Sequence, residues 1–164
     1  GMLFSGPLIR EVIAWQRDFP ALCLVVDPVM VATSGARLLK PSAIRLLCDG
    51  LLPRASLVTP NLDEAAVLLG WAVEHEEELE EAARQIHGRW GCPVLLKGGH
   101  LRGGRSAVDV FWDGTISLRL SAPFVRGIST HGTGCTYSAA IAARCAQGDP
   151  LAKAVRADLR RADS

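Results

Sequence analysis

The stretch Ser129-Thr130-His131-Gly132-Thr133-Gly134-Cys135-Thr136 decides how the rest of the chain is interpreted. An alanine-rich run follows it, so the pattern indicates a tight turn that leads directly into a buried helix. The first N–H groups of a helix lack internal partners and carry the positive end of the dipole, and neighbouring glycines let an anion approach. The stretch therefore predicts a cradle for a phosphate or oxyanion, with Cys135 at its inner edge. The alternative is an ordinary glycine-rich loop before a packed helix.

The composition is that of a globular protein with a substantial core. The chain has 164 residues, of which 49% are hydrophobic and 21% are charged, which indicates one domain. The formal net charge is +1, so there is no electrostatic case for binding nucleic acid or an acidic membrane.

The cysteines and the apolar runs indicate a cytoplasmic protein. The chain has 5 cysteines, an odd number, and no two of them have the C-x-x-C spacing. We interpret them as reduced thiols, because neither a disulfide framework nor a zinc site fits this pattern. No apolar run approaches the ~20 residues that span a bilayer, and charged residues interrupt the N-terminal segment, so no signal peptide is visible.

Helical stripes alternate along the chain with short apolar runs. We expect helices over residues 6–19, 41–50, 62–69 and 76–90, after Cys135, and from Pro150 onward. Buried strands are expected over residues 22–26, 56–59 and 93–96, and a β-hairpin over residues 107–120 with Asp113 and Gly114 in its turn. This order predicts an α/β fold with a parallel sheet and right-handed crossovers.

Polar clusters follow the carboxyl ends of the expected strands or begin a helix. They are Asp27, Asn61 with Glu64, the run 97–100, and the turn 132–135. Each has an ordinary explanation by itself: Asp27 could cap a loop, and an acidic residue in the first turn of a helix suits the dipole. Because open α/β sheets bind ligands at the carboxyl ends of their strands, four clusters at one edge favour a binding site for an anion.

The residue types at this edge suit phosphoryl transfer. A lysine, two carboxylates that suit Mg²⁺ (Asp27 and Glu64), and a helix N-terminus can position phosphates and neutralise their charge. The chain contains no G-x-x-x-x-G-K-[ST] motif, so it is not a P-loop protein, and Gly98-Gly99 is too little for a dinucleotide fingerprint.

Four motifs together resemble a known family. They occur in this order: Val25-Val26-Asp27-Pro28-Val29-Met30, Thr59-Pro60-Asn61-Leu62-Asp63-Glu64-Ala65, Lys97-Gly98-Gly99-His100 and Thr130-His131-Gly132-Thr133-Gly134-Cys135. They look like the hydroxymethylpyrimidine/phosphomethylpyrimidine kinases of thiamine biosynthesis, members of the ribokinase-like superfamily. The resemblance covers almost the whole chain. It implies a three-layer α/β/α fold with a mostly parallel sheet, and a kinase that uses ATP and Mg²⁺.

The resemblance implies a catalytic role for the turn quoted first. Gly132, Thr133 and Gly134 would form the anion hole for the transferring phosphoryl group. Cys135 would lie beside the substrate hydroxymethyl group as the candidate base, and the helix N-terminus would favour its thiolate. Related kinases, including many pyridoxal kinases, carry aspartate at this position, whereas the pyrimidine kinases carry cysteine. The alternative for Cys135 is a small, buried packing residue.

The resemblance also assigns residues to the nucleotide and to the pyrimidine ring. Lys97 would meet the nucleotide phosphates, and Thr59 and Gly99 would belong to the same ATP and phosphate site. Val29 and Met2 would flank the pyrimidine ring as apolar contacts.

A metal site is implied by the N-x-x-E element. Asn61 and Glu64 match that element, which positions Mg²⁺ and phosphate through water. Asp27 would belong to the same metal network as Glu64.

The chain differs from members of the family in its length. Relatives have about a hundred more residues at the amino end, so residues 1–164 would form a partial kinase domain without the N-terminal strands and the last helices. An open sheet without its first strands leaves an unpaired edge. We therefore expect poor solubility or association of the isolated chain, little turnover, and a homodimer only at full length. A monomer with a normal turnover rate would contradict this.

Two other functions remain open, and a third is disfavoured. A pyridoxal kinase would share the fold and mechanism, and a non-catalytic module would bind nucleotide without turning it over. A cysteine-nucleophile hydrolase is disfavoured, because no histidine has a spacing that argues for a catalytic dyad.

Overall fold

The structure is a computed structural model of the chain, and it describes residues 2–32, 35–99, 101, 106–123 and 133–159. The predicted anion-hole residue Gly132 lies outside these residues. Among the helices within them, none combines the length and the apolar character that crossing a membrane requires.

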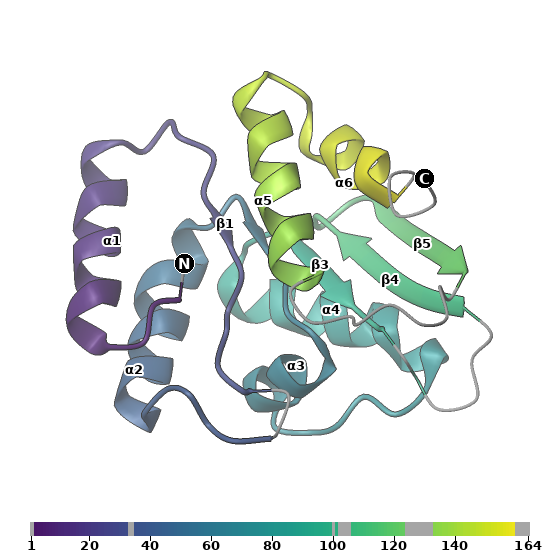
Figure 1. Cartoon of the computed structure of the whole chain (residues 1–164), viewed down its shortest axis with the longest axis horizontal. Helices are drawn as coiled ribbons and strands as arrows, with labels where there is room; N and C mark the ends of the chain where they lie inside the picture. Colours follow the sequence, from purple (N-terminus) through teal and green to yellow (C-terminus); the bar gives the residue numbers. More distant parts are fainter. Residues whose placement is uncertain (1, 33–34, 100, 102–105, 124–132, 160–164) are drawn as a thin grey trace.

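A five-stranded sheet with the order β1-β2-β3-β4-β5 lies at the centre of the fold (Figure 1). Its strands are β1 (Val25–Val26), β2 (Leu57–Val58), β3 (Val94–Lys97), β4 (Ser106–Trp112) and β5 (Ser117–Pro123). The first three strands are parallel, whereas β4 and β5 pair antiparallel. The α/β class is therefore confirmed, and the sheet is mixed because β4 runs antiparallel to both β3 and β5.

Helices cover both faces of the sheet, which confirms the three-layer architecture (Figure 1). One face carries α1 (Gly6–Asp18), α2 (Pro41–Leu46), α3 (Leu62–Leu69) and α4 (Leu79–Trp90), and the other carries α5 (Thr133–Ala146) and α6 (Leu151–Leu159). Neighbouring strand residues point to opposite faces. Leu57 packs with α5 and α6, for example, whereas Val58 packs in the core beneath the other four helices.

Local signals in the sequence explain where α3 begins and ends. The side chain of Asn61 accepts a hydrogen bond from the backbone N–H of Glu64, and the Glu64 carboxylate accepts one from the backbone N–H of Asn61. This reciprocal pair is a capping box. Gly70 ends the helix in the left-handed conformation at φ 86°, where glycine carries no Cβ penalty.

Two expected elements differ in detail. The strand expected over residues 22–26 is reduced to Val25–Val26, since β1 pairs with β2 alone among the described strands. The helix expected from residue 76 begins with a 3₁₀ turn over Glu76–Glu78 before α4, and α2 continues into a π-helical turn over Leu47–Leu51.

Candidate functional site

The carboxyl ends of β1, β2 and β3 meet the amino end of α5 at one edge of the sheet (Figure 1). Asp27 follows β1, Thr59 follows β2, Lys97 ends β3, and Cys135 lies in the first turn of α5. These four side chains form one connected group in the structure. The edge that the sequence predicted therefore brings together residues that are far apart along the chain.

Asp27 is the hub of this group. Lys97 Nζ donates a hydrogen bond to Asp27 Oδ1 at 2.9 Å, and Thr59 Oγ1 donates to the same oxygen at 3.3 Å. The Lys97 and Asp27 side chains are 14% and 17% exposed. At this burial each charge offsets the desolvation cost of the other. The pair therefore places a cation at the sheet edge and holds it within reach of solvent.

Thr59 joins the sheet to α5. It is completely buried, and its hydroxyl lies 2.8 Å from the hydroxyl of Ser138, which is also buried. A hydroxyl with these two partners connects Asp27 with α5. The expected contact between Thr59 and phosphate stays a prediction.

Cys135 is exposed, and its neighbours raise the pKa of its thiol. The largest cause is burial of the sulfur, followed by a hydrogen bond to Asp27 and repulsion by that carboxylate, while the positive charge of Lys97 lowers the pKa. The expectation of a favoured thiolate is therefore wrong. The N-terminus of α5 favours a thiolate, but the neighbouring Asp27 carboxylate favours the protonated thiol. The sequence placed both groups at one edge of the sheet but did not show that they are in contact.

Glu64 is buried and only 2% exposed. Burial raises the pKa of its carboxyl to about 7, although hydrogen bonds from the Asn61 and Met30 backbones and the charge of Lys97 oppose the shift. Asp27 acts in the opposite direction to Lys97 and raises the pKa. Glu64 therefore belongs to the same electrostatic group as Asp27 and Lys97.

The donor set fits a magnesium ion held largely by phosphate and water. Within the described part of the chain, no three His, Cys, Asp or Glu side chains form a ready metal cage. Mg²⁺ in phosphoryl-transfer sites commonly uses one or two carboxylates together with substrate phosphates and water. Asp27 and Glu64 supply that number of carboxylates in one electrostatic group.

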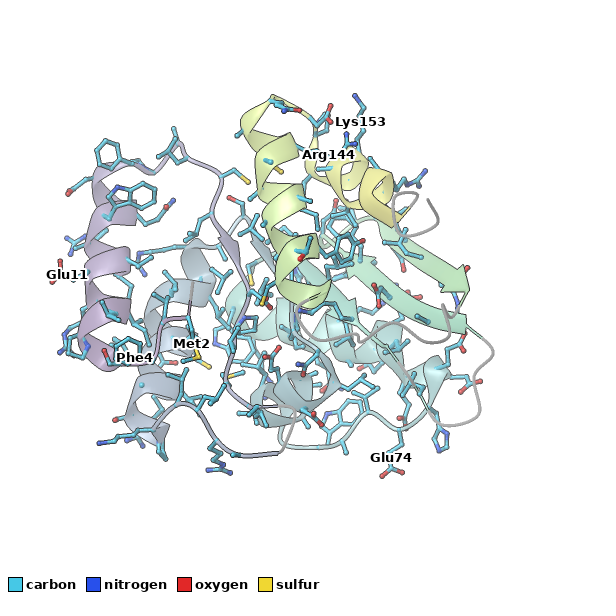
Figure 2. The ribbon with its side chains drawn as sticks, in the orientation of Figure 1. Met2, Phe4, Glu11, Glu74, Arg144 and Lys153 are labelled. Carbon is cyan, nitrogen blue, oxygen red and sulfur yellow. The ribbon has the colours of Figure 1, made fainter. Side chains whose placement is uncertain are left out.

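An apolar pocket of about 430 Å³ lies beside Asp27 and Cys135. Met2 and Val29, the expected pyrimidine contacts, both line it. Figure 2 shows Met2 between α1 and the segment that follows β1. The other lining residues come from β1, α1, α5 and their neighbours: Leu3, Val12, Leu24, Val25, Val26, Leu51, Ser138, Ala139 and Ala142. The structure thus brings the expected ring contacts and the expected base to one cavity.

The Gly98–Gly99 turn faces a partner that sequence reasoning missed. Asp109 of β4 accepts a hydrogen bond from Gly98 N at 3.0 Å. Burial raises the pKa of its carboxyl to about 6, and hydrogen bonds from the Gly98 and Gly99 backbones, together with the charge of Lys97, oppose the shift. The Gly99 amide therefore bonds to Asp109, and the expected contact between Gly99 and ATP stays a prediction.

Ser138 and Asp109 were not among the residues predicted from the sequence, and only the first of them has a signal there. Ser138 is three residues after Cys135, and this spacing places both on one face of a helix, so the sequence carried a signal. Asp109 carried none, because only the register of β4 against β3 places it opposite Lys97. The helix expected after Cys135 begins two residues earlier, at Thr133. The part of Thr133 and Gly134 in an anion hole stays a prediction.

Comparisons with known proteins agree with this arrangement. The family described as phosphomethylpyrimidine kinase matches residues 1–159. The hydroxymethylpyrimidine/phosphomethylpyrimidine kinase of Rhizobium meliloti is 52% identical over 134 residues, which cover 81% of this chain and 50% of the relative.

Two solved structures have the same fold. Phosphomethylpyrimidine kinase from Clostridium difficile superposes with a TM-score of 0.83 at 32% identity, covering 100% of this chain and 67% of that one. An ADP complex of Bacillus subtilis pyridoxal kinase superposes with a TM-score of 0.85 at 34% identity, covering 94% and 58%. The chain thus spans about half to two thirds of the length of these relatives. The chain belongs to the phosphomethylpyrimidine kinase family.

Proposed function

We propose that the protein phosphorylates 4-amino-5-hydroxymethyl-2-methylpyrimidine and its monophosphate with ATP, as a step in thiamine biosynthesis. The observation that carries this proposal is the pocket in which Met2 and Val29 lie together with Asp27 and Cys135. An apolar cavity of about 430 Å³ suits a small aromatic ring. The hydrogen-bonding groups at its edge suit a substrate hydroxyl.

The reaction needs positioning and charge neutralisation more than covalent chemistry. The substrate hydroxyl oxygen forms a bond to the γ-phosphorus, and the bond from that phosphorus to the ADP oxygen breaks. Cys135 lies at the pocket and hydrogen-bonds to Asp27. As the proton of the substrate hydroxyl moves to the Cys135 sulfur, the thiol proton moves along its hydrogen bond to the Asp27 carboxylate, so the pair gains one proton.

Lys97 and the start of α5 stabilise the negative charge of the nucleotide phosphates. Lys97 brings an ammonium to the edge of the sheet, where it stabilises charge on the transferring group. Gly132, Thr133 and Gly134 remain our proposed anion hole. Magnesium bound with ATP would neutralise further charge, and Asp27 and Glu64 would hold its waters.

Pyridoxal kinase is the second candidate. The superposition on the Bacillus subtilis pyridoxal kinase, with a TM-score of 0.85, favours it. The higher sequence identity to the Rhizobium meliloti pyrimidine kinase, 52%, supports the first candidate. A non-catalytic nucleotide-binding module is the third.

A single assay separates these candidates. Phosphorylation of the pyrimidine alcohol and of pyridoxal is measured at saturating ATP and magnesium, on the protein at its natural length. We expect a higher kcat/KM for the pyrimidine alcohol. Faster phosphorylation of pyridoxal would favour the second candidate, and nucleotide binding without turnover of either alcohol would favour the third. The homodimer and the cytoplasmic location remain predictions, which sedimentation and fractionation would check.

A further inference from the structure

Asp109 lies directly opposite Lys97 in the antiparallel pairing of β4 with β3. Its carboxylate extends past that pairing to the turn that follows Lys97, where it accepts hydrogen bonds from the Gly98 and Gly99 backbones. One side chain therefore holds two consecutive backbone N–H groups. These N–H groups come immediately after the lysine that we place at the nucleotide phosphates.

The turn fits this place only because both residues are glycines. A Cβ at Gly98 would lie 2.0 Å from the carbonyl oxygen of Val108 and 3.0 Å from Cδ1 of Leu79. Gly99 has a φ of 51°, in the left-handed region that disfavours side chains. The turn is thus pressed against β4, which brings its amides within reach of Asp109.

Lys97 is held from both sides by this arrangement. Its backbone N–H donates to the carbonyl oxygen of Pro60 at 2.8 Å, on the side of β2. The turn held by Asp109 follows directly on its other side. Its ammonium then reaches Asp27 at 2.9 Å. The location of the cation therefore depends on β4, from which none of the residues lining the pocket comes.

We propose that Asp109 is a positioning residue, which fixes the Gly98–Gly99 turn and thereby the place of Lys97 at the nucleotide phosphates. This inference rests on the proposed kinase function. Asp109 is not among the residues that line the pocket. A carboxylate suits the role because its oxygens can accept from both N–H groups, whereas an asparagine offers one oxygen and an NH₂ group that repels them.

The test compares Asp109→Asn with a matched control on the same hairpin. Asp113 also holds a turn, since its carboxylate accepts hydrogen bonds from the Thr115 and Ile116 backbones at 2.9 Å and 2.7 Å. Its turn is at the opposite end of β4 from the site. Asp113→Asn therefore removes the same kind of contact without touching Lys97.

The measurements are titration calorimetry with ADP and with AMP-PCP, and the KM values for ATP and for the alcohol, on the protein at its natural length. We expect Asp109→Asn to weaken nucleotide binding and raise the KM for ATP by roughly tenfold or more, the order of loss that a displaced charged contact causes. The KM for the alcohol should change less than twofold. Asp113→Asn should lower the unfolding midpoint and leave all nucleotide constants unchanged.

The unmodified protein gives a second measurement that needs no variant to fold. Hydrogen exchange at the Gly98 and Gly99 amides should be slow, because both are bonded to Asp109. Rapid exchange at both, or an Asp109→Asn protein that binds nucleotide as tightly as wild type, would overturn the inference. Wild-type protein that binds ADP but phosphorylates no pyrimidine alcohol would refute the proposed function alone, since the calorimetry on Asp109 stands without it.

Discussion

Cys135 and Asp27 together determine the protonation state at the pocket. The thiol is exposed, yet burial of its sulfur and the adjacent carboxylate raise its pKa above the ordinary value. Lys97 opposes this and simultaneously pairs with Asp27. The thiol therefore holds its proton more tightly than an ordinary cysteine does. We therefore expect the hydrogen-bonded pair of Cys135 and Asp27, and not an isolated thiolate, to accept the substrate proton.

Replacing Cys135 by Ala tests this pair. We expect kcat for the pyrimidine alcohol to fall by about a hundredfold or more, as for the loss of a general base. The KM for ATP should stay within a few fold. Cys23→Ser is the control, because Cys23 is also an exposed thiol but precedes β1 and is not among the residues lining the pocket. Steady-state kinetics on both variants would decide, and unchanged turnover in Cys135→Ala would exclude the thiol from catalysis.

Asp109 should make the free energy of unfolding depend on pH, and a variant without its carboxyl group can separate this contribution from those of other groups. Burial raises its pKa to about 6 from the ordinary 3.8, although Lys97 and the glycine backbones oppose the shift. The folded protein thus holds this proton more tightly than the unfolded chain does. The stabilisation is complete below pH about 4 and is lost as the pH rises through about 6.

The expected change follows from comparing wild type with Asp109→Asn. Between pH 7 and pH 4, the free energy of unfolding of wild type should gain up to about 3 kcal/mol relative to the variant, which corresponds to a shift of about two pKa units. Urea unfolding at several pH values measures this difference. A difference that is independent of pH would show that the carboxyl does not titrate as described.

At the scale of elements, the start of α3 couples fold and site. Asn61 caps the helix, and Glu64, which completes the capping box, is also part of the electrostatic group around Lys97. Thr59 connects the end of β2 with Ser138 in α5. The side chains that cap the start of α3 and connect the end of β2 to α5 are therefore the same ones that build the candidate site.

Replacing Asn61 by Ala should destabilise the protein by about 1–2 kcal/mol, the usual cost of losing an N-cap side chain. Asp63→Ala is the matched control, since Asp63 is an exposed acid in the same first turn and takes no part in the capping box. Its loss should cost about 0.3–1 kcal/mol through the dipole alone. Urea unfolding of both proteins checks this, and equal losses would argue against the capping box.

Elements fixed by local signals could be predicted from the sequence, whereas those fixed by pairing could not. The bounds of the helix over residues 62–69 were correct because Asn61 and Gly70 act on their own neighbours. The first strand was predicted too long, since its length depends on β2, whose residues are distant in sequence.

The same distinction explains the site. Asp27, Lys97 and Cys135 could be predicted because parallel strands end at one edge of a sheet. The direction of the Cys135 pKa shift and the role of Asp109 could not be predicted. The role of Asp109 depends on the register of β4 against β3, and the pKa shift of Cys135 depends on how α5 packs against the end of β1.

For the whole molecule, the two helical layers differ greatly in the size of their cores. The layer of α1 to α4 contains most of the buried apolar residues among those described, whereas α5 and α6 pack on a small cluster that includes Leu57, Leu95, Phe111 and Ile141. Segments with few buried apolar contacts open at lower free energy. The layer that carries Cys135 is therefore the less stable one.

Hydrogen exchange followed by mass spectrometry should show this asymmetry. Amides of α5 and α6 should exchange faster than those of α4 and β3, and bound ADP should slow exchange in the first turns of α5. The Asp113→Asn protein serves as a control for general loosening. Protection of α5 equal to that of α4 would contradict the difference between the layers.

The change of strand direction at β3 also determines the order of events in time. β4 and β5 are joined by a short turn, so they can meet within microseconds, whereas Val25 of β1 must find Leu57 across an intervening helix. Loop closure over that distance is slower and costs more entropy. When the complete denatured chain refolds, we therefore expect the half of the sheet that holds Asp109 to form before the half that presents Asp27, so that the support for the lysine exists before its counter-ion arrives.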